Sequence, residues 1–99
     1  MKKLFISLIT VFTLAKIVNA QEISGTVVDE RNLPIFAANV YFKSNPHNGA
    51  ISDLNGYFSI PYTYDNDTLI ITFIGYQNKR IPAVELEEDS KNIITLNAD

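Results

Sequence analysis

Between residue 21 and the end of the chain, apolar residues recur at every second position within short runs, and turn-forming residues separate those runs. Such alternation is typical of strands that bury one face, and several short strands at regular spacing are typical of an all-β sandwich. No stretch of this part has the 3.6-residue period of a helix. The pattern predicts about seven strands, within residues 23–28, 38–43, 50–52, 57–60, 69–74, 76–81 and 93–96.

The large apolar side chains at alternating positions of these runs form the expected core. The run 69–74 is almost continuously apolar, which is typical of a central strand that is covered on both faces. The expected core consists of Val27, Val40, Phe42, Phe58, Ile60, Leu69, Ile71 and Phe73.

A tight turn is predicted where Asp53 and Leu54 are followed by Asn55 and Gly56. An aspartate carboxylate accepts hydrogen bonds from N–H groups of a turn, and the pair Asn-Gly tolerates positive φ. This pattern predicts a hairpin between residues 50–52 and 57–60. Four residues are therefore interpreted as structural turn residues: Asp53, Asn55, Gly56, and Gly75, where a kink is expected after the run 69–74.

The first twenty residues have the pattern of a cleaved signal peptide. Two lysines precede an apolar run at residues 4–15, and Val18-Asn19-Ala20 supplies small residues before Gln21. The run is short for a membrane span, and Lys16 interrupts it. No cysteine follows it, which excludes a lipid-anchored lipoprotein. We therefore expect residues 1–20 to be a signal peptide, and residues 21–99 to form an exported domain without a membrane span.

Charge and cysteine content narrow the class of protein. Removing the signal leaves 99 − 20 = 79 residues, enough for one domain with a modest core. Lys2, Lys3 and Lys16 leave with the signal, so the formal charge changes from −3 to −3 − 3 = −6. A nucleic-acid-binding protein would need the opposite sign. The chain has no cysteine and cannot form disulfides, which favours a bacterial envelope protein over a eukaryotic secreted mini-protein.

Three ordered stretches carry a resemblance to a known family. They are residues 23–29 with Pro34 and 38–40, Gly49 with 52–58, and 69–74 with Gly75-Tyr76. With these stretches the chain resembles the carboxypeptidase regulatory-like domain, a transthyretin-like (prealbumin-like) β-sandwich of bacterial envelope proteins. Two positions depart from the family pattern: Phe36-Ala37 stands where many members have Pro-Gly, and Ala50 stands where threonine is common. In that family such domains often lie at the N-terminus of TonB-dependent receptors of the outer membrane, or beside peptidases.

The residues give no catalytic constellation, so the chain is predicted not to be an enzyme and to hold no cofactor. His47 is the only histidine, which rules out a Ser-His-Asp triad or a multi-histidine metal site within one chain. The zinc ligands of carboxypeptidases belong to their catalytic domain, and nothing here matches them. Aspartates at 53, 65 and 67 suggest calcium, but their spacing is not that of an EF-hand loop, so no metal is predicted. The acidic run 85–89 is interpreted as a solvated linker.

Recognition of a partner is the function that this composition favours. Tyr62 and Tyr64 lie in a predicted loop, where aromatic side chains can anchor a protein or stack on a sugar. The edges of an open sandwich offer unpaired backbone groups to a partner strand, and the acidic surface favours basic segments. The leading hypothesis is a structural or protein-binding module that binds another envelope protein, located in the periplasm, at the outer membrane or outside the cell.

Two alternatives remain open at this point. A carbohydrate-binding module would need Tyr62 and Tyr64 side by side on one exposed surface. An N-terminal extension of a truncated TonB-dependent receptor would act through a neighbouring domain.

Overall fold

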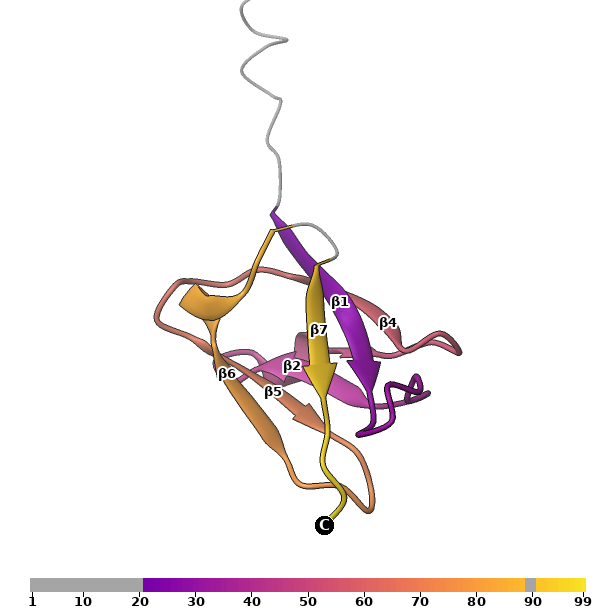
Figure 1. Ribbon diagram of the computed structural model, residues 1–99. Helices are drawn as coiled ribbons and strands as arrows, with labels where there is room; N and C mark the ends of the chain where they lie inside the picture. Colours follow the sequence, from indigo (N-terminus) through magenta and orange to yellow (C-terminus); the bar gives the residue numbers. More distant parts are fainter. Residues whose placement is uncertain (1–20, 89–90) are drawn as a thin grey trace, which may run out of the picture.

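The computed structural model describes residues 21–88 and 91–99, and it places seven strands in two sheets that pack face to face (Figure 1). The predicted signal peptide lies outside the described residues. One sheet has the order β4-β1-β7 and the other has the order β3-β2-β5-β6. The predicted all-β sandwich is confirmed. The strands are β1 Glu22–Val28, β2 Asn39–Phe42, β3 Ala50–Ile51, β4 Tyr57–Pro61, β5 Thr68–Thr72, β6 Lys79–Pro82 and β7 Asn92–Thr95.

Two short 3₁₀ helices, η1 Pro46–Asn48 and η2 Ala83–Glu85, are the helical elements of the described residues. None of these residues forms a helix that is long and apolar enough to cross a bilayer.

Strand pairing differs from the expected hairpin. β3 pairs with β2, whereas β4 pairs with β1 in the other sheet, so the turn between β3 and β4 links the two sheets. Ser52 fixes this arrangement, because its hydroxyl accepts a hydrogen bond from Ala38 N–H (2.9 Å) and donates one to Ile35 O (2.7 Å). A period-two pattern identifies each strand but not its neighbour, and the prediction of a β3-β4 ladder was wrong for that reason.

The core lies between the two sheets, and seven of the eight predicted residues are fully buried in it. Phe73 is the exception, because β5 ends at Thr72 and Phe73 packs against the core only in part. The chain turns there, with Tyr76 N–H donating to Phe73 O (3.1 Å), and Ile74 is 89% exposed. The buried apolar residues are Ile23, Val27, Val28, Ile35, Ala38, Val40, Phe42, Phe58, Ile60, Leu69, Ile70, Ile71, Ala83, Ile94 and Leu96.

β5 is a central strand, and the middle of it is buried on both faces as its composition predicts. Ile70 faces outward yet is only 6% exposed, and Tyr41 on β2 and Arg80 on β6 stand directly opposite it. The following strand is shorter than expected, since within residues 76–81 only Lys79 onward belongs to β6. Tyr76 instead forms an isolated antiparallel bridge with Ala98.

The first long loop contains two residues in the left-handed region, Asn32 (φ 66°) and Ala37. Ala37 has φ 71°, a conformation that favours glycine. Its N–H donates to Ser52 O (2.9 Å), so the loop keeps this conformation although alanine disfavours it. The loop thereby presents Phe36, which is 55% exposed, at one end of the sandwich.

Candidate functional site

The two tyrosines that the sequence singled out have different environments. Tyr62 is half-buried, its ring meets Phe42 edge-on with centroids 5.9 Å apart, and its hydroxyl donates to Asp65 Oδ1. This hydrogen bond, more than burial or the nearby negative charge, raises the pKa of Tyr62. Tyr64 is 58% exposed. Of the two tyrosines, Tyr64 is thus the exposed one, while the ring of Tyr62 packs against Phe42.

The turn between β3 and β4 is held by the carboxylate of Asp53. Its Oδ1 accepts hydrogen bonds from Asn55 N–H and Tyr57 N–H, both at 2.9 Å, while Asp53 O accepts one from Gly56 N–H (2.9 Å). Gly56 has φ 76°, whereas Asn55 is not among the residues with positive φ. Gly75, at φ 87°, lies in the turn after β5. The four residues therefore occupy turns, and nothing in their contacts points to a ligand.

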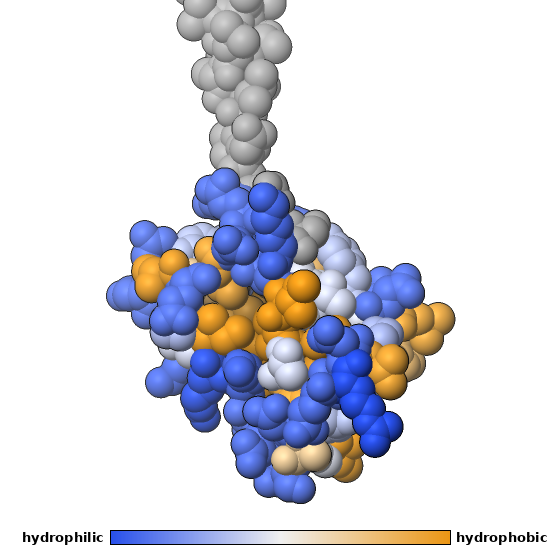
Figure 2. Space-filling view, viewed as in Figure 1, coloured by the Kyte–Doolittle hydropathy of each residue, from blue (hydrophilic) through white to orange (hydrophobic). Residues whose placement is uncertain are grey.

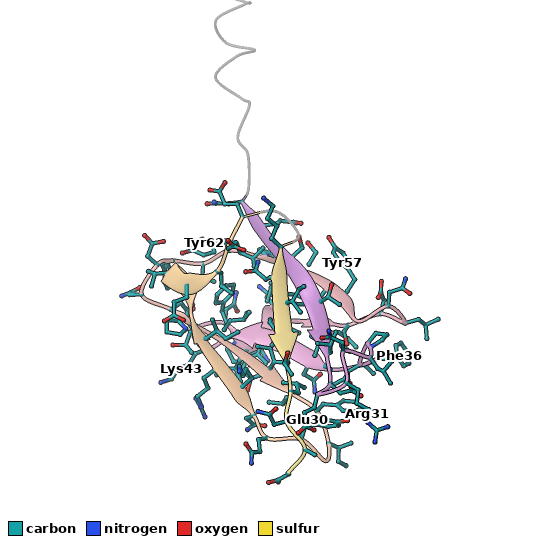
Figure 3. All side chains as sticks on the ribbon, viewed as in Figure 1. Glu30, Arg31, Phe36, Lys43, Tyr57 and Tyr62 are labelled. Carbon is teal, nitrogen blue, oxygen red and sulfur yellow. The ribbon has the colours of Figure 1, made fainter. Side chains whose placement is uncertain are left out.

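Exposed apolar side chains gather where the loop 29–37 meets the turn 53–56. The two segments are in contact, because a Cβ on Gly56 would lie 3.1 Å from Pro34 Cβ. Leu33 and Phe36 on the loop are each 55% exposed, and Leu54 in the turn is 75% exposed. Figures 2 and 3 show apolar surface and Phe36 at the right-hand end of the domain. This end of the sandwich therefore carries exposed apolar surface.

Asp67 is a buried carboxylate whose role was not recognised from the sequence. Its Oδ1 accepts hydrogen bonds from Ser44 N–H (3.2 Å) and Thr68 N–H (2.8 Å), and its Oδ2 accepts the hydroxyls of Ser44 and Thr63. Its backbone carbonyl accepts Ala83 N–H (2.9 Å). The side chain thus joins the loop after β2 to the loop before β5, and its role is structural.

The described residues contain no group of three or more histidine, cysteine, aspartate or glutamate side chains that could hold a metal ion. Asp53 and Asp67, which had suggested calcium, lie in different loops, and each accepts the hydrogen bonds given above. His47 lies in η1 and is exposed.

Comparison with known proteins identifies the family. The sequence model of the CarboxypepD_reg-like domain matches residues 23–99. The chain belongs to this family. A TonB-dependent receptor of Formosa agariphila is 30% identical to the domain over 71 residues, which are 72% of this chain and 7% of the receptor. The chain therefore spans less than a tenth of that relative.

Two solved structures share the fold of the CarboxypepD_reg-like domain. They are chains from crystal structures of the type II Cohesin-X-Dockerin complex of Acetivibrio cellulolyticus, one an N-terminal and one a C-terminal interface mutant. Their TM-scores are 0.62 and 0.63 at 21% and 20% identity, and each match covers 79% of this chain and 58% of the other. At this identity the likeness is one of fold.

Two polar residues that stabilise the CarboxypepD_reg-like domain were missed because they resemble ordinary loop residues in the sequence. Asp67 stands in a polar run, and the signal that was available is its position directly before an apolar strand. Asn92 opens β7, and its amide Nδ2 donates to Ser24 O (3.0 Å) and Glu87 O (2.7 Å), while its Oδ1 accepts Glu87 N–H (2.7 Å). Both side chains satisfy backbone groups of loops that flank the core.

The buried carboxylate predicts a pH dependence of stability. Burial raises the pKa of Asp67, but hydrogen bonds from Ser44, Thr63 and Thr68 outweigh burial and lower it below its usual value of 3.8. A lowered folded-state pKa stabilises the fold at higher pH, and this contribution is lost as pH falls through that pKa. We expect Asp67→Ala to lower the free energy of unfolding by about 1–3 kcal/mol at pH 7, and the difference from the parent to shrink below about pH 4.

Urea unfolding of both proteins at several pH values between 7 and 3 measures this difference. Glu88→Ala, at an exposed position, serves as the control and should stay within about 0.5 kcal/mol of the parent at pH 7. A difference between Asp67→Ala and the parent that stays constant down to pH 3 would contradict the assignment of an ionised, hydrogen-bonded Asp67.

Proposed function

We propose that this chain is an exported, non-catalytic module of the bacterial cell envelope that binds another polypeptide. The observation that carries the proposal is the number of large apolar side chains that the small sandwich leaves exposed. Nine of the described residues are in this group: Leu33, Phe36, Ile51, Leu54, Tyr57, Tyr64, Ile74, Val84 and Ile93. Such side chains are enriched where a domain meets a protein partner.

The envelope location rests on two further observations. The first is the signal-peptide pattern of residues 1–20, and the second is the similarity to part of a TonB-dependent receptor. Mass spectrometry of the protein from its native envelope should find Gln21 at or near the N-terminus. At a formal charge of −6, the mature domain would associate with basic segments and be repelled by anionic membranes.

Capture on immobilised residues 21–99 tests the binding function. We expect saturable retention of at least one envelope protein, weakened as salt is raised from low to physiological ionic strength, because exposed charges are screened. The double variant Phe36→Ser, Leu54→Ser removes exposed apolar area and should reduce retention, while Tyr62→Ala, Tyr64→Ala tests the loop tyrosines. Retention of glycans alone would support the carbohydrate-binding alternative, and retention of nothing would contradict a binding function.

A second candidate function is that of a module within a larger receptor of the TonB-dependent class. The observation that favours it is the 30% identity to the receptor of Formosa agariphila over 72% of this chain. Reading the genomic sequence that follows the codon for Asp99 distinguishes the two. A reading frame that continues into a receptor domain supports this candidate, and a stop codon supports a separate module.

A further inference from the structure

The sandwich has four sheet edges, and two of them carry features that oppose pairing with a foreign strand. β3 has only two residues. β6 contains Lys79, Arg80 and Pro82 within four residues. Short edge strands, charged side chains and proline are the means by which proteins keep edges from pairing. These two edges therefore make poor docking sites.

The edge of β4 is occupied by its own chain. Val27 N–H donates to Gly56 O (2.7 Å), so Gly56 directs its carbonyl towards β1. Backbone groups alternate in direction along a strand, and Tyr57, Ser59 and Pro61 therefore direct theirs to the free side. Tyr57 N–H donates to Asp53 Oδ1 (2.9 Å), and Tyr57 O accepts Asp53 N–H (2.9 Å). Pro61, at the far end, has no N–H. Little of this edge remains for a partner strand.

β7 is the remaining edge, and it is open. It pairs with β1 on one side only, in parallel register, and Leu96 N–H donates to Val28 O (2.9 Å). By the alternation of a parallel ladder, Ile93 and Thr95 then direct their N–H and C=O groups away from β1. Neither residue has a backbone partner on that side among the described residues. β7 also contains no charged residue and no proline.

The chain itself shows that this edge can pair. Just beyond β7, Gln77 N–H donates to Asn97 O (2.9 Å) and Asp99 N–H donates to Gly75 O (3.0 Å). An antiparallel bridge joins Tyr76 to Ala98 in the same stretch. Residues 75–77 therefore use the continuation of the β7 edge, and the open positions at Ile93 and Thr95 come directly before it.

A groove runs beside the open part of β7, towards β6 and η2. It has a volume of about 330 Å³, and Figure 2 shows apolar surface bordered by polar residues at the place of β7 in Figure 1. A strand added to β7 would direct every second side chain towards this groove. The lining residues are Ile81, Glu85, Leu86, Glu87, Lys91, Asn92, Ile93 and Ile94.

The charge of the groove indicates the partner. Glu85 and Glu87 contribute two negative charges to the lining and Lys91 one positive charge, in a mature domain of formal charge −6. Glu87 is fixed beside the strand, because the side chain of Asn92 bonds both its N–H and its C=O at 2.7 Å. These bonds hold the backbone of Glu87, so a basic side chain on an incoming strand would meet a carboxylate whose backbone is anchored beside β7.

We propose that the β7 edge binds one extended polypeptide segment, in which apolar and basic residues alternate, as an added strand of the three-stranded sheet. This inference rests on the proposed protein-binding function and names the surface and the partner chemistry. Backbone hydrogen bonds to Ile93 and Thr95 give affinity, and the groove with Glu85 and Glu87 selects the side chains.

A synthetic octapeptide of alternating valine and lysine is the probe, titrated against residues 21–99, the part that contains every described strand. We expect saturable binding, and slowed hydrogen exchange of the Ile93 and Thr95 amides when the peptide is bound. The same peptide with N-methylated backbone amides, and a valine-glutamate peptide, should each bind at least about tenfold more weakly. Equal binding of the N-methylated peptide would overturn strand addition, since its side chains and charge are unchanged.

Two proline variants form the matched pair. Thr95→Pro removes an N–H that faces the free edge of β7, and Ser59→Pro removes one that faces the free edge of β4, so neither breaks a backbone hydrogen bond to β1. Ser59→Pro also removes the exposed side-chain hydrogen bond from Ser59 Oγ to Glu22 Oε1 (2.8 Å). Thr95→Pro should weaken peptide binding at least about tenfold, and Ser59→Pro should leave it unchanged. Equal effects of the two variants would overturn the assignment to β7.

The same pair separates this inference from the proposed function. If immobilised parent retains an envelope protein and Thr95→Pro retains as much, the β7 assignment fails while the binding function stands. If retention falls with Thr95→Pro but not with Ser59→Pro, the β7 assignment is supported. If the parent retains nothing, the binding function itself fails.

Discussion

Replacing Phe58 by alanine is expected to lower the free energy of unfolding by about 3–5 kcal/mol. The side chain is 2% exposed and lies between the sheets, where its ring passes so close to Gly25 that a Cβ on that residue would stand 3.1 Å from Phe58 Cε1. Gly25 is opposite Phe58 in the ladder between β1 and β4, so truncating the ring leaves a cavity that neither strand can fill. Urea unfolding followed by circular dichroism measures the change.

Phe36→Ala is the matched control, because it removes the same side chain from a position that is 55% exposed. We expect a change within about 0.5 kcal/mol there. A domain of this size has about 5–15 kcal/mol of stability at most, so Phe58→Ala could fail to fold. Phe58→Leu, with an expected loss of about 1–2 kcal/mol, keeps the comparison measurable. If Phe58→Leu and Phe36→Ala matched the parent equally well, Phe58 would not be a core residue.

The two-sheet fold could be predicted because burial imposes a period of two on each strand, and seven of the eight proposed core residues obey it. Strand pairing could not be predicted in the same way. The pattern around the turn at Asp53 is that of a hairpin between β3 and β4. The Ser52 hydroxyl, however, accepts a hydrogen bond from Ala38 N–H, and β3 pairs with β2. The hydrogen bonds that decide between the two sheets join residues 14 positions or more apart, and no local pattern encodes them.

For the candidate site, the sequence predicted the kind of surface but not its position on the domain. Edge strands and exposed aromatics follow from an open sandwich, but which edge is open depends on details of neighbouring loops. Asp53 occupies the free edge of β4, because its carboxylate accepts a hydrogen bond from Tyr57 N–H. Asn92 fixes the backbone of Glu87 beside β7. The sequence favoured Tyr62 and Tyr64 as partner contacts because aromatic residues in loops often contact a partner. In the structure, Tyr62 instead packs against Phe42 and donates a hydrogen bond to Asp65. Each of these outcomes depends on tertiary contacts.

Gly56→Ala is expected to lower the free energy of unfolding by about 2–5 kcal/mol, the sum of left-handed strain and overpacking. Gly56 has φ 76°, and a Cβ there would stand 2.4 Å from Val27 O and 3.1 Å from Pro34 Cβ. Moving the turn away from Val27 would relieve this clash, but it would also break the hydrogen bond from Val27 N–H to Gly56 O (2.7 Å).

Gly75→Ala separates the two causes. Gly75 has φ 87°, but a Cβ there would meet nothing within 4 Å, so this variant bears only the backbone strain of about 1–2 kcal/mol. Thermal and urea unfolding of both variants give the comparison, and the excess loss in Gly56→Ala measures the clash with β1. Equal losses would mean that the turn shifts away from Val27 without cost. A larger loss in Gly56→Ala would show that the contact between Gly56 and Val27 fixes the point where the chain passes from one sheet to the other.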